Sequence, residues 1–175
     1  MLHFLFTLFL IQSSHFRYWE DYDHCHQQSI IQSNKVANIV YTYLEKKWNL
    51  TDDKRTFLLL EELTSLQTDP EVKALYFSVF NNILLLNIDG AIGEAIIDYV
   101  YIILCRDPIY VINYIVNHQT YYCIYKQDLA LFCYFTNKDV ITLRQEIEMK
   151  LQLNDYTRYF NTLFSDIEKL IANYQ

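Results

Sequence analysis

Residues 69–86 read DPEVKALYFSVFNNILLL, and this stretch decides the fold class. Asp69 is a favourable helix N-cap, Pro70 fits the first helical position, and Glu71 places a negative charge in the first turn. The apolar side chains that follow recur at the spacing of one helix face. They are Val72, Leu75, Tyr76, Val79, Phe80 and Ile83. The stretch therefore predicts a helix from residue 70 to about residue 86.

The same start signal returns at Asp107 and Pro108, where it predicts a helix that runs to about residue 118. The run before it, residues 91–105, is apolar around most of its circumference, so we expect it in the middle of a bundle. The residues after the two Asp-Pro pairs do not align, which favours a compact bundle over an array of repeats. Other helices are expected after the capping residues 51–53 and over residues 27–48, 127–136, 139–152 and 155–173.

Glycine and proline are too scarce for most other folds. The 175 residues include 2 glycines and 2 prolines, whereas sandwiches and barrels need turn residues at short intervals. Residues 121–125 (YYCIY) favour a strand, but one strand does not make a sheet. The sequence therefore predicts an all-α, single-domain bundle of about seven to eight antiparallel helices around a central helix near 91–105.

The N-terminus carries an apolar run, residues 2–11 (LHFLFTLFLI), followed by a short polar stretch. The run is too short to span a bilayer, which takes about 20 residues, but it has the form of the apolar part of a secretory signal. We therefore expect a signal peptide over 1–13, a polar lead-in over 14–26 and a helical domain over 27–175, with no transmembrane anchor in the mature chain. The alternative is a cytoplasmic protein whose N-terminal run folds as a helix, since no Lys or Arg precedes the run.

Composition and charge argue against several classes of function. The formal net charge is −7 and no dense basic run occurs, so nucleic-acid binding is not expected. Phosphate-binding loops need several glycines at fixed positions, and this chain cannot supply them. No nucleophile elbow or zinc-protease pattern occurs either. We expect no cofactor, and a role other than catalysis is favoured.

Two carboxylates are notable on the predicted central helix. Glu94 and Asp98 are one helical turn apart, so both project from the same side. The simplest interpretation is that they form the solvent-facing edge of the helix. The more specific hypothesis is a carboxylate pair that lines a cleft for a cation or a basic partner.

The chain contains 16 tyrosines, many of them between residues 110 and 134. Tyrosine is enriched at binding surfaces because it combines a rigid apolar ring with a polar hydroxyl. The candidates for a surface or cleft are Tyr110, Tyr114, Tyr121 and Tyr122. The alternative is that they are half-buried at contacts between helices, in a composition also rich in Ile, Asn and Leu.

Metal-ligand residue types concentrate in one short segment of the lead-in. They form a weak candidate for zinc or copper, and a solvated polar segment is favoured over it. The residues are Asp23, His24, Cys25 and His26. No C-x-x-C occurs, and Cys105, Cys123 and Cys133 have apolar or aromatic neighbours, so buried free thiols are expected rather than disulfides.

These observations favour a non-enzymatic helical domain, exported or associated with the cell envelope, that binds a protein or peptide partner. One alternative is a cytoplasmic acidic binding protein of the immunity or antitoxin type, whose partner is a basic toxin. Another is a small hydrolase that uses Glu94 and Asp98 as a carboxylate pair.

Overall fold

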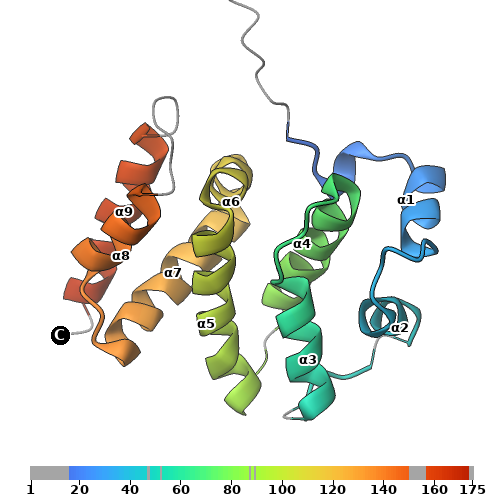
Figure 1. Ribbon diagram of the computed structural model, residues 1–175. Coiled ribbons are helices and arrows are strands. Elements are labelled where there is room, and N and C mark those ends of the chain that lie inside the picture. The colour runs from blue at the N-terminus through green and yellow to red at the C-terminus, as the bar shows by residue number, and fades with distance from the viewer. Residues whose placement is uncertain are drawn as a thin grey trace, which may run out of the picture.

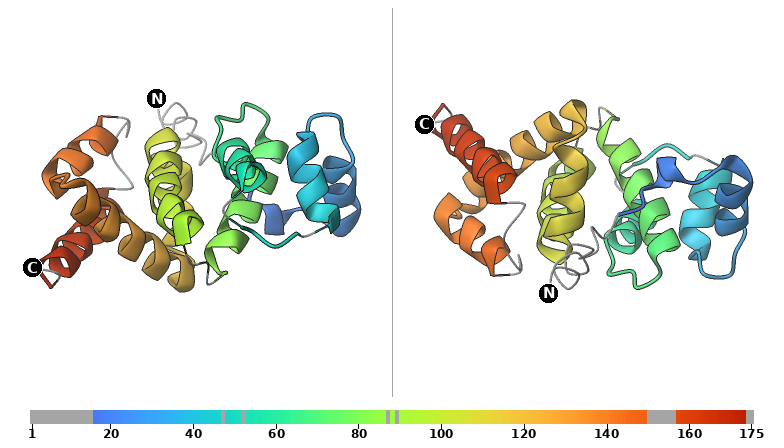
Figure 2. Two further views of the ribbon diagram at one scale, coloured as in Figure 1. Left: turned by 90° about the horizontal axis from the view of Figure 1, so that it is seen from below. Right: turned by 90° about the horizontal axis from the view of Figure 1, so that it is seen from above.

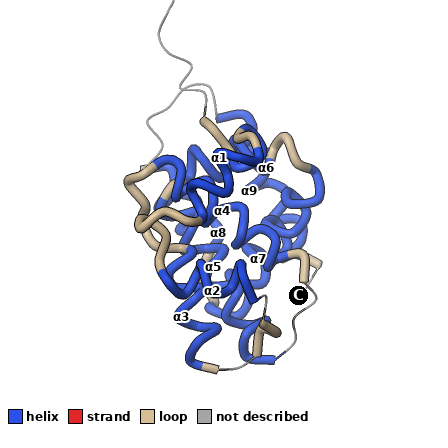
Figure 3. Tube along the Cα trace, turned by 90° about the vertical axis from the view of Figure 1, so that its right-hand side faces the viewer, coloured by secondary structure: helices blue, strands red, loops and turns tan. Residues whose placement is uncertain are grey.

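The computed structural model describes residues 16–46, 48–51, 53–86, 88, 90–149 and 157–173. Within these ranges the chain forms nine α-helices, one short 3-10 helix and no strand, which confirms the all-α prediction (Figure 1 and Figure 3). The elements are η1 (Trp19–Asp21), α1 (His24–Ile31), α2 (Asn38–Lys46), α3 (Lys54–Leu63), α4 (Pro70–Leu84), α5 (Gly90–Arg106), α6 (Pro108–Ile115), α7 (Gln119–Thr136), α8 (Val140–Glu148) and α9 (Thr157–Ala172).

Aspartate side chains cap the N-termini of several helices. Asp69 accepts hydrogen bonds from two backbone N–H groups at the start of α4, and Pro70 occupies the first helical position. Asp53 and Asp107 cap α3 and α6, each by accepting one backbone N–H, so all three predicted starts are confirmed. Each cap satisfies N–H groups that have no partner inside the helix and contributes about 1 kcal/mol. Two further caps are Asp23 on α1 and Asp139 on α8.

The predicted single helix over 27–48 is wrong. The structure divides this range into α1 and α2, which are separated by residues 32–37. Tertiary contacts fix the break, because the Ala37 N–H donates to the Tyr76 hydroxyl of α4 at 2.9 Å and the Val36 side chain is buried. The polar lead-in also ends earlier than expected, because α1 begins at His24. The predicted signal peptide, residues 1–13, lies outside the described residues.

The predicted helix over 127–136 begins earlier, at Gln119, so residues 121–125 are helical rather than extended. Packing explains the difference, since this part of α7 lies against other helices. The buried Tyr125 hydroxyl donates to the side-chain oxygen of the buried Asn81 of α4 at 3.0 Å. Tertiary contacts of this kind override the strand preference of Tyr and Ile.

Helix α5 lies at the centre of the bundle, as the sequence predicts. It packs against α3, α6, α7 and α8, and its Val100 and Leu104 side chains are completely buried. Helices α1 and α2 lie at one end of the molecule and α8 and α9 at the other, so the helices follow one another in chain order (Figure 1 and Figure 2). No helix in the described ranges is long and apolar enough to cross a bilayer.

Candidate functional site

A groove of about 400 Å³ lies between α3 and α5. Its volume is within the range of about 300–1,000 Å³ that is usual for ligand pockets. The apolar part of its lining comes from Phe57, Ala95, Tyr99 and Ile102, and the polar part from Glu61, Thr64, Asp98 and Arg106. The groove therefore combines an apolar surface with charges of both signs.

Helical spacing brings these side chains into the groove. Phe57 and Glu61 of α3 and its C-terminal cap residue Thr64 follow one another at intervals of about one turn, and so lie on one side of the helix. The lining residues of α5 share a face for the same reason, from Ala95 to Arg106. The two helices pack against each other and run in the same direction (Figure 1). Their lining faces therefore form the two walls of one groove.

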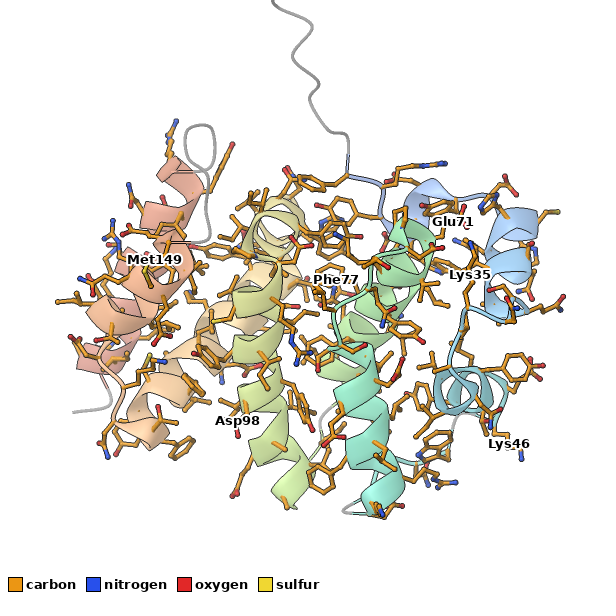
Figure 4. The ribbon with its side chains drawn as sticks, viewed as in Figure 1. Lys35, Lys46, Glu71, Phe77, Asp98 and Met149 are labelled. Atoms are coloured by element: carbon orange, nitrogen blue, oxygen red, sulfur yellow. The ribbon has the colours of Figure 1, made fainter. Side chains whose placement is uncertain are left out.

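The two acidic side chains come from opposite walls, Glu61 from α3 and Asp98 from α5. Both are exposed, and Figure 4 shows Asp98 projecting from the surface of α5. Burial raises the pKa of the Tyr99 hydroxyl, and the negative charges of Glu61 and Asp98 raise it further. Because one hydroxyl is affected by both carboxylates, the two acids act on the same part of the groove.

Arg106 lies at the C-terminal end of the groove. Its guanidinium donates to the backbone carbonyl of Thr64, the C-terminal cap residue of α3. This bond joins the ends of the two helices and satisfies a carbonyl that has no partner within α3. The groove is therefore acidic along its middle and basic where Arg106 bridges its end.

The two carboxylates that the sequence analysis paired, Glu94 and Asp98, lie in different surroundings. Asp98 lines the groove, whereas Glu94 is exposed and is not part of the lining. The acid that accompanies Asp98 in the groove is Glu61, which the sequence did not single out. The available signal was its position one turn after Phe57 on a helix with a clear cap at Asp53.

Tyr110 and Tyr114 do not line an open peptide groove, contrary to the sequence hypothesis. Each is only 3% exposed. Tyr110 does border a cavity of about 40 Å³, which is too small for a peptide. Their hydroxyls donate to the Arg17 carbonyl and the Glu20 carboxylate, both at 3.1 Å. Burial raises the pKa of both hydroxyls, so both stay protonated and act as donors.

These two tyrosines hold an N-terminal strap, residues 16–22, against α4 and α6. The Tyr18 hydroxyl donates to the Tyr110 carbonyl, and the Tyr18 ring contacts the rings of Phe77, Tyr110 and Tyr114. Phe77 lies on α4 where that helix faces α6 (Figure 4). Aromatic pairs of this type add about 0.5–1.5 kcal/mol each beyond their burial. Tyr18, Tyr110 and Tyr114 therefore form a packing contact between the N-terminal strap, α4 and α6.

The other two candidate tyrosines, Tyr121 and Tyr122, are half-buried on α7. The Tyr121 ring lies 5.5 Å from the ring of Tyr114, and the Tyr122 hydroxyl donates to the Asp166 carboxylate of α9 at 3.0 Å. Burial and the charge of Asp166 raise the Tyr122 pKa. These contacts join α7 to α6 and α9, and they match the alternative in which the tyrosines lie between helices.

The candidate metal ligands of the lead-in do not converge on one point, and two of them, Asp23 and His26, bind other groups. Asp23 caps α1, and its bond from the His26 N–H lowers the pKa of its carboxyl. The His26 ring stacks on Tyr22, and its Nε2 lies 2.8 Å from the Glu71 carboxylate (Figure 4 labels Glu71). Nowhere in the described part of the chain do three His, Cys, Asp or Glu side chains form a group suited to a metal ion.

None of the four cysteines, all of which lie in the described ranges, forms a disulfide. Cys133 is buried, as the sequence predicts, whereas Cys105 is only partly buried. Cys123 was expected to be buried but is exposed, because it lies on the outer face of α7.

A second groove, of about 590 Å³, lies between α2 and α4. Its described lining is largely apolar and includes Tyr43, Trp48, Val79 and Leu86. None of these lining side chains carries a charge. Unlike this second groove, the groove between α3 and α5 offers charged groups that can orient a ligand.

No known protein family, curated protein or solved structure matches this chain. The function has to be inferred from the chemistry of the groove between α3 and α5.

Proposed function

We propose that this protein is a non-enzymatic binding domain that holds a basic segment of a partner protein in the groove between α3 and α5. The observation that carries the proposal is the pair of acids on opposite walls, Glu61 and Asp98, above an apolar lining. A Lys or Arg side chain has the complementary form, because its alkyl stem packs on apolar surface while its charge meets carboxylates. A groove of about 400 Å³ accommodates one or two such side chains.

The overall charge supports a basic partner as well. A net charge of −7 attracts a basic protein over a distance of about 8–10 Å at physiological salt and speeds its approach. Exposed ion pairs contribute only about 0.2–1 kcal/mol each. The charges of Glu61 and Asp98 therefore provide selectivity, and the apolar contacts in the groove provide much of the affinity.

The proposal includes export of the protein, because residues 1–13 have the form of a signal peptide. Sequencing of the N-terminus of the mature protein tests this part. A start near Ser14 is expected. An intact Met1 would contradict export and favour the alternative of a cytoplasmic acidic protein that binds a basic toxin.

NMR titration of the ¹⁵N-labelled protein tests the groove. The probe is a hexapeptide of alternating lysine and leucine with both ends blocked, and the control peptide has glutamate in place of lysine. Shifts of the backbone amides in α3 and α5 are expected with the lysine peptide. The double variant Glu61→Gln, Asp98→Asn should weaken its binding about tenfold, because two ion pairs are lost.

Glu94→Gln is the matched control, since it removes one exposed negative charge from α5 outside the groove. It should change the Kd by less than about twofold, as expected for a charge that makes no direct contact. Equal weakening by Glu94→Gln and by Asp98→Asn would show that the peptide responds only to net charge. That result, or equal binding of the glutamate peptide, would refute the proposal.

A further inference from the structure

The acidic and basic side chains of the groove lie at different positions along its length. This order determines which part of a partner chain the groove can bind. A helix rises about 1.5 Å per residue. Glu61 precedes Thr64 by three residues, so it lies about 5 Å along the helix axis from the Arg106 end of the groove. Asp98 precedes Arg106 by eight residues, so it lies about 12 Å from that end. A cation held between the two acids is therefore about 8 Å from that end. The groove therefore has an acidic part and a basic end, so its two ends are chemically different.

Arg106 retains hydrogen-bonding capacity. A guanidinium has five N–H donors, and in the described ranges the Arg106 side chain has one hydrogen-bond acceptor, the Thr64 carbonyl, and no acidic partner within 4.0 Å. The residue is exposed and belongs to the groove lining. Its remaining donors are suited to a carboxylate, which arginine binds with two parallel hydrogen bonds.

Arg106 also limits how far a segment can extend. Its bond to Thr64 joins the ends of α3 and α5, so a chain lying in the groove meets this bridge at the C-terminal side. A continuous segment would have to rise over the bridge, whereas a chain terminus can stop there. The group that a terminus presents at that point is an α-carboxylate.

We propose that the groove receives the C-terminal end of its partner. This inference rests on the proposed function. The terminal carboxylate binds Arg106, and a Lys or Arg side chain binds between Glu61 and Asp98. An extended chain covers about 3.3 Å per residue, so a separation of about 8 Å places the basic residue about two to three positions before the terminus.

The test compares two tetrapeptides that differ only at the C-terminus. Both have a blocked N-terminus and lysine at the third position from the end, and one ends in a free acid and the other in an amide. By NMR titration the free acid should bind about tenfold more tightly to the wild-type protein. In Arg106→Gln this preference should disappear, while the amide keeps its wild-type Kd.

Three controls make the result decisive. Arg158→Gln removes the same charge from the exposed surface of α9 and should keep the tenfold preference. Arg106→Lys retains the charge and should keep part of the preference for the free acid. This variant also tests the inference if Arg106→Gln fails to fold. A third peptide ends in an amidated glutamate and should bind like the plain amide.

The possible failures are distinguishable. If the free acid and the amide bind the wild-type protein with equal Kd, this inference is overturned, and the proposed function stands. If the amidated glutamate binds as tightly as the free acid, the groove accepts any carboxylate and the assignment to a chain terminus is wrong. If neither tetrapeptide shifts the amides of α3 and α5, both proposals fail.

Discussion

Replacing Asp128 with asparagine is expected to stabilise the protein at neutral pH. Asp128 lies on α7 with a partly buried side chain, and its carboxylate has no hydrogen bond or ion pair within the described part of the chain. Burial away from water raises the pKa of this carboxyl from 3.8 to about 6. An ionised carboxylate therefore costs free energy in the folded state that it does not cost in the unfolded chain.

The size of the effect follows from the two pKa values. The difference between a pKa of about 6 and the ordinary 3.8 corresponds to about 3 kcal/mol at pH 8, where the group is ionised in both states. The folded protein holds its proton more tightly, so this penalty is absent below about pH 4, grows between about pH 4 and pH 6, and levels off above pH 6. Asparagine carries no charge, but its amide also requires partners, so we expect a gain of about 1–3 kcal/mol at pH 8.

Urea denaturation followed by circular dichroism measures the gain. The difference in unfolding free energy between Asp128→Asn and wild type should be largest at pH 8 and shrink toward zero near pH 4. Asp98→Asn is the matched control, because Asp98 is an exposed aspartate on another helix and its change should be within about 0.5 kcal/mol. A difference that stays constant with pH, or a loss of stability at pH 8, would refute the reasoning.

Three other substitutions test the packing and the caps, each by urea denaturation. Tyr125→Phe leaves the buried side-chain oxygen of Asn81 without its donor and should cost about 1–3 kcal/mol, whereas loss of an exposed tyrosine hydroxyl should cost nothing measurable. Asp69→Ala removes the cap of α4 and should cost about 1–2 kcal/mol at pH 7. Because its bond from Lys35 lowers the Asp69 pKa, the loss should fade as pH falls below about 4. Gly93→Ala places a methyl group against the backbone carbonyl of Ile88 and should cost about 1–3 kcal/mol; an unchanged midpoint would show that α5 shifts freely there.

One of the three charged residues that line the candidate groove was singled out from the sequence. Asp98 was visible, together with Glu94, as an acid on a helix that is apolar around most of its circumference, and that helix is central. Glu61 was not visible, because acids are common on helix surfaces and its importance depends on which helix lies beside α3. Arg106 escaped notice for the same reason, since its role depends on the Thr64 carbonyl of another helix.

The sequence alone determined the helical class and several helix starts. Caps at Asp53, Asp69 and Asp107 act within about one turn of the chain, and scarce glycine excludes turn-rich folds, so neither inference requires knowledge of distant contacts.

Only the tertiary structure decided where a helix breaks and which side chains share a surface. The break before α2 depends on Tyr76, and the burial of Tyr110 and Tyr114 depends on the N-terminal strap. The opposition of Glu61 and Asp98 depends on the packing of α3 against α5. Each of these features arises from contacts between residues far apart in the chain, and helical periodicity specifies the face of a side chain but not the helix that it meets.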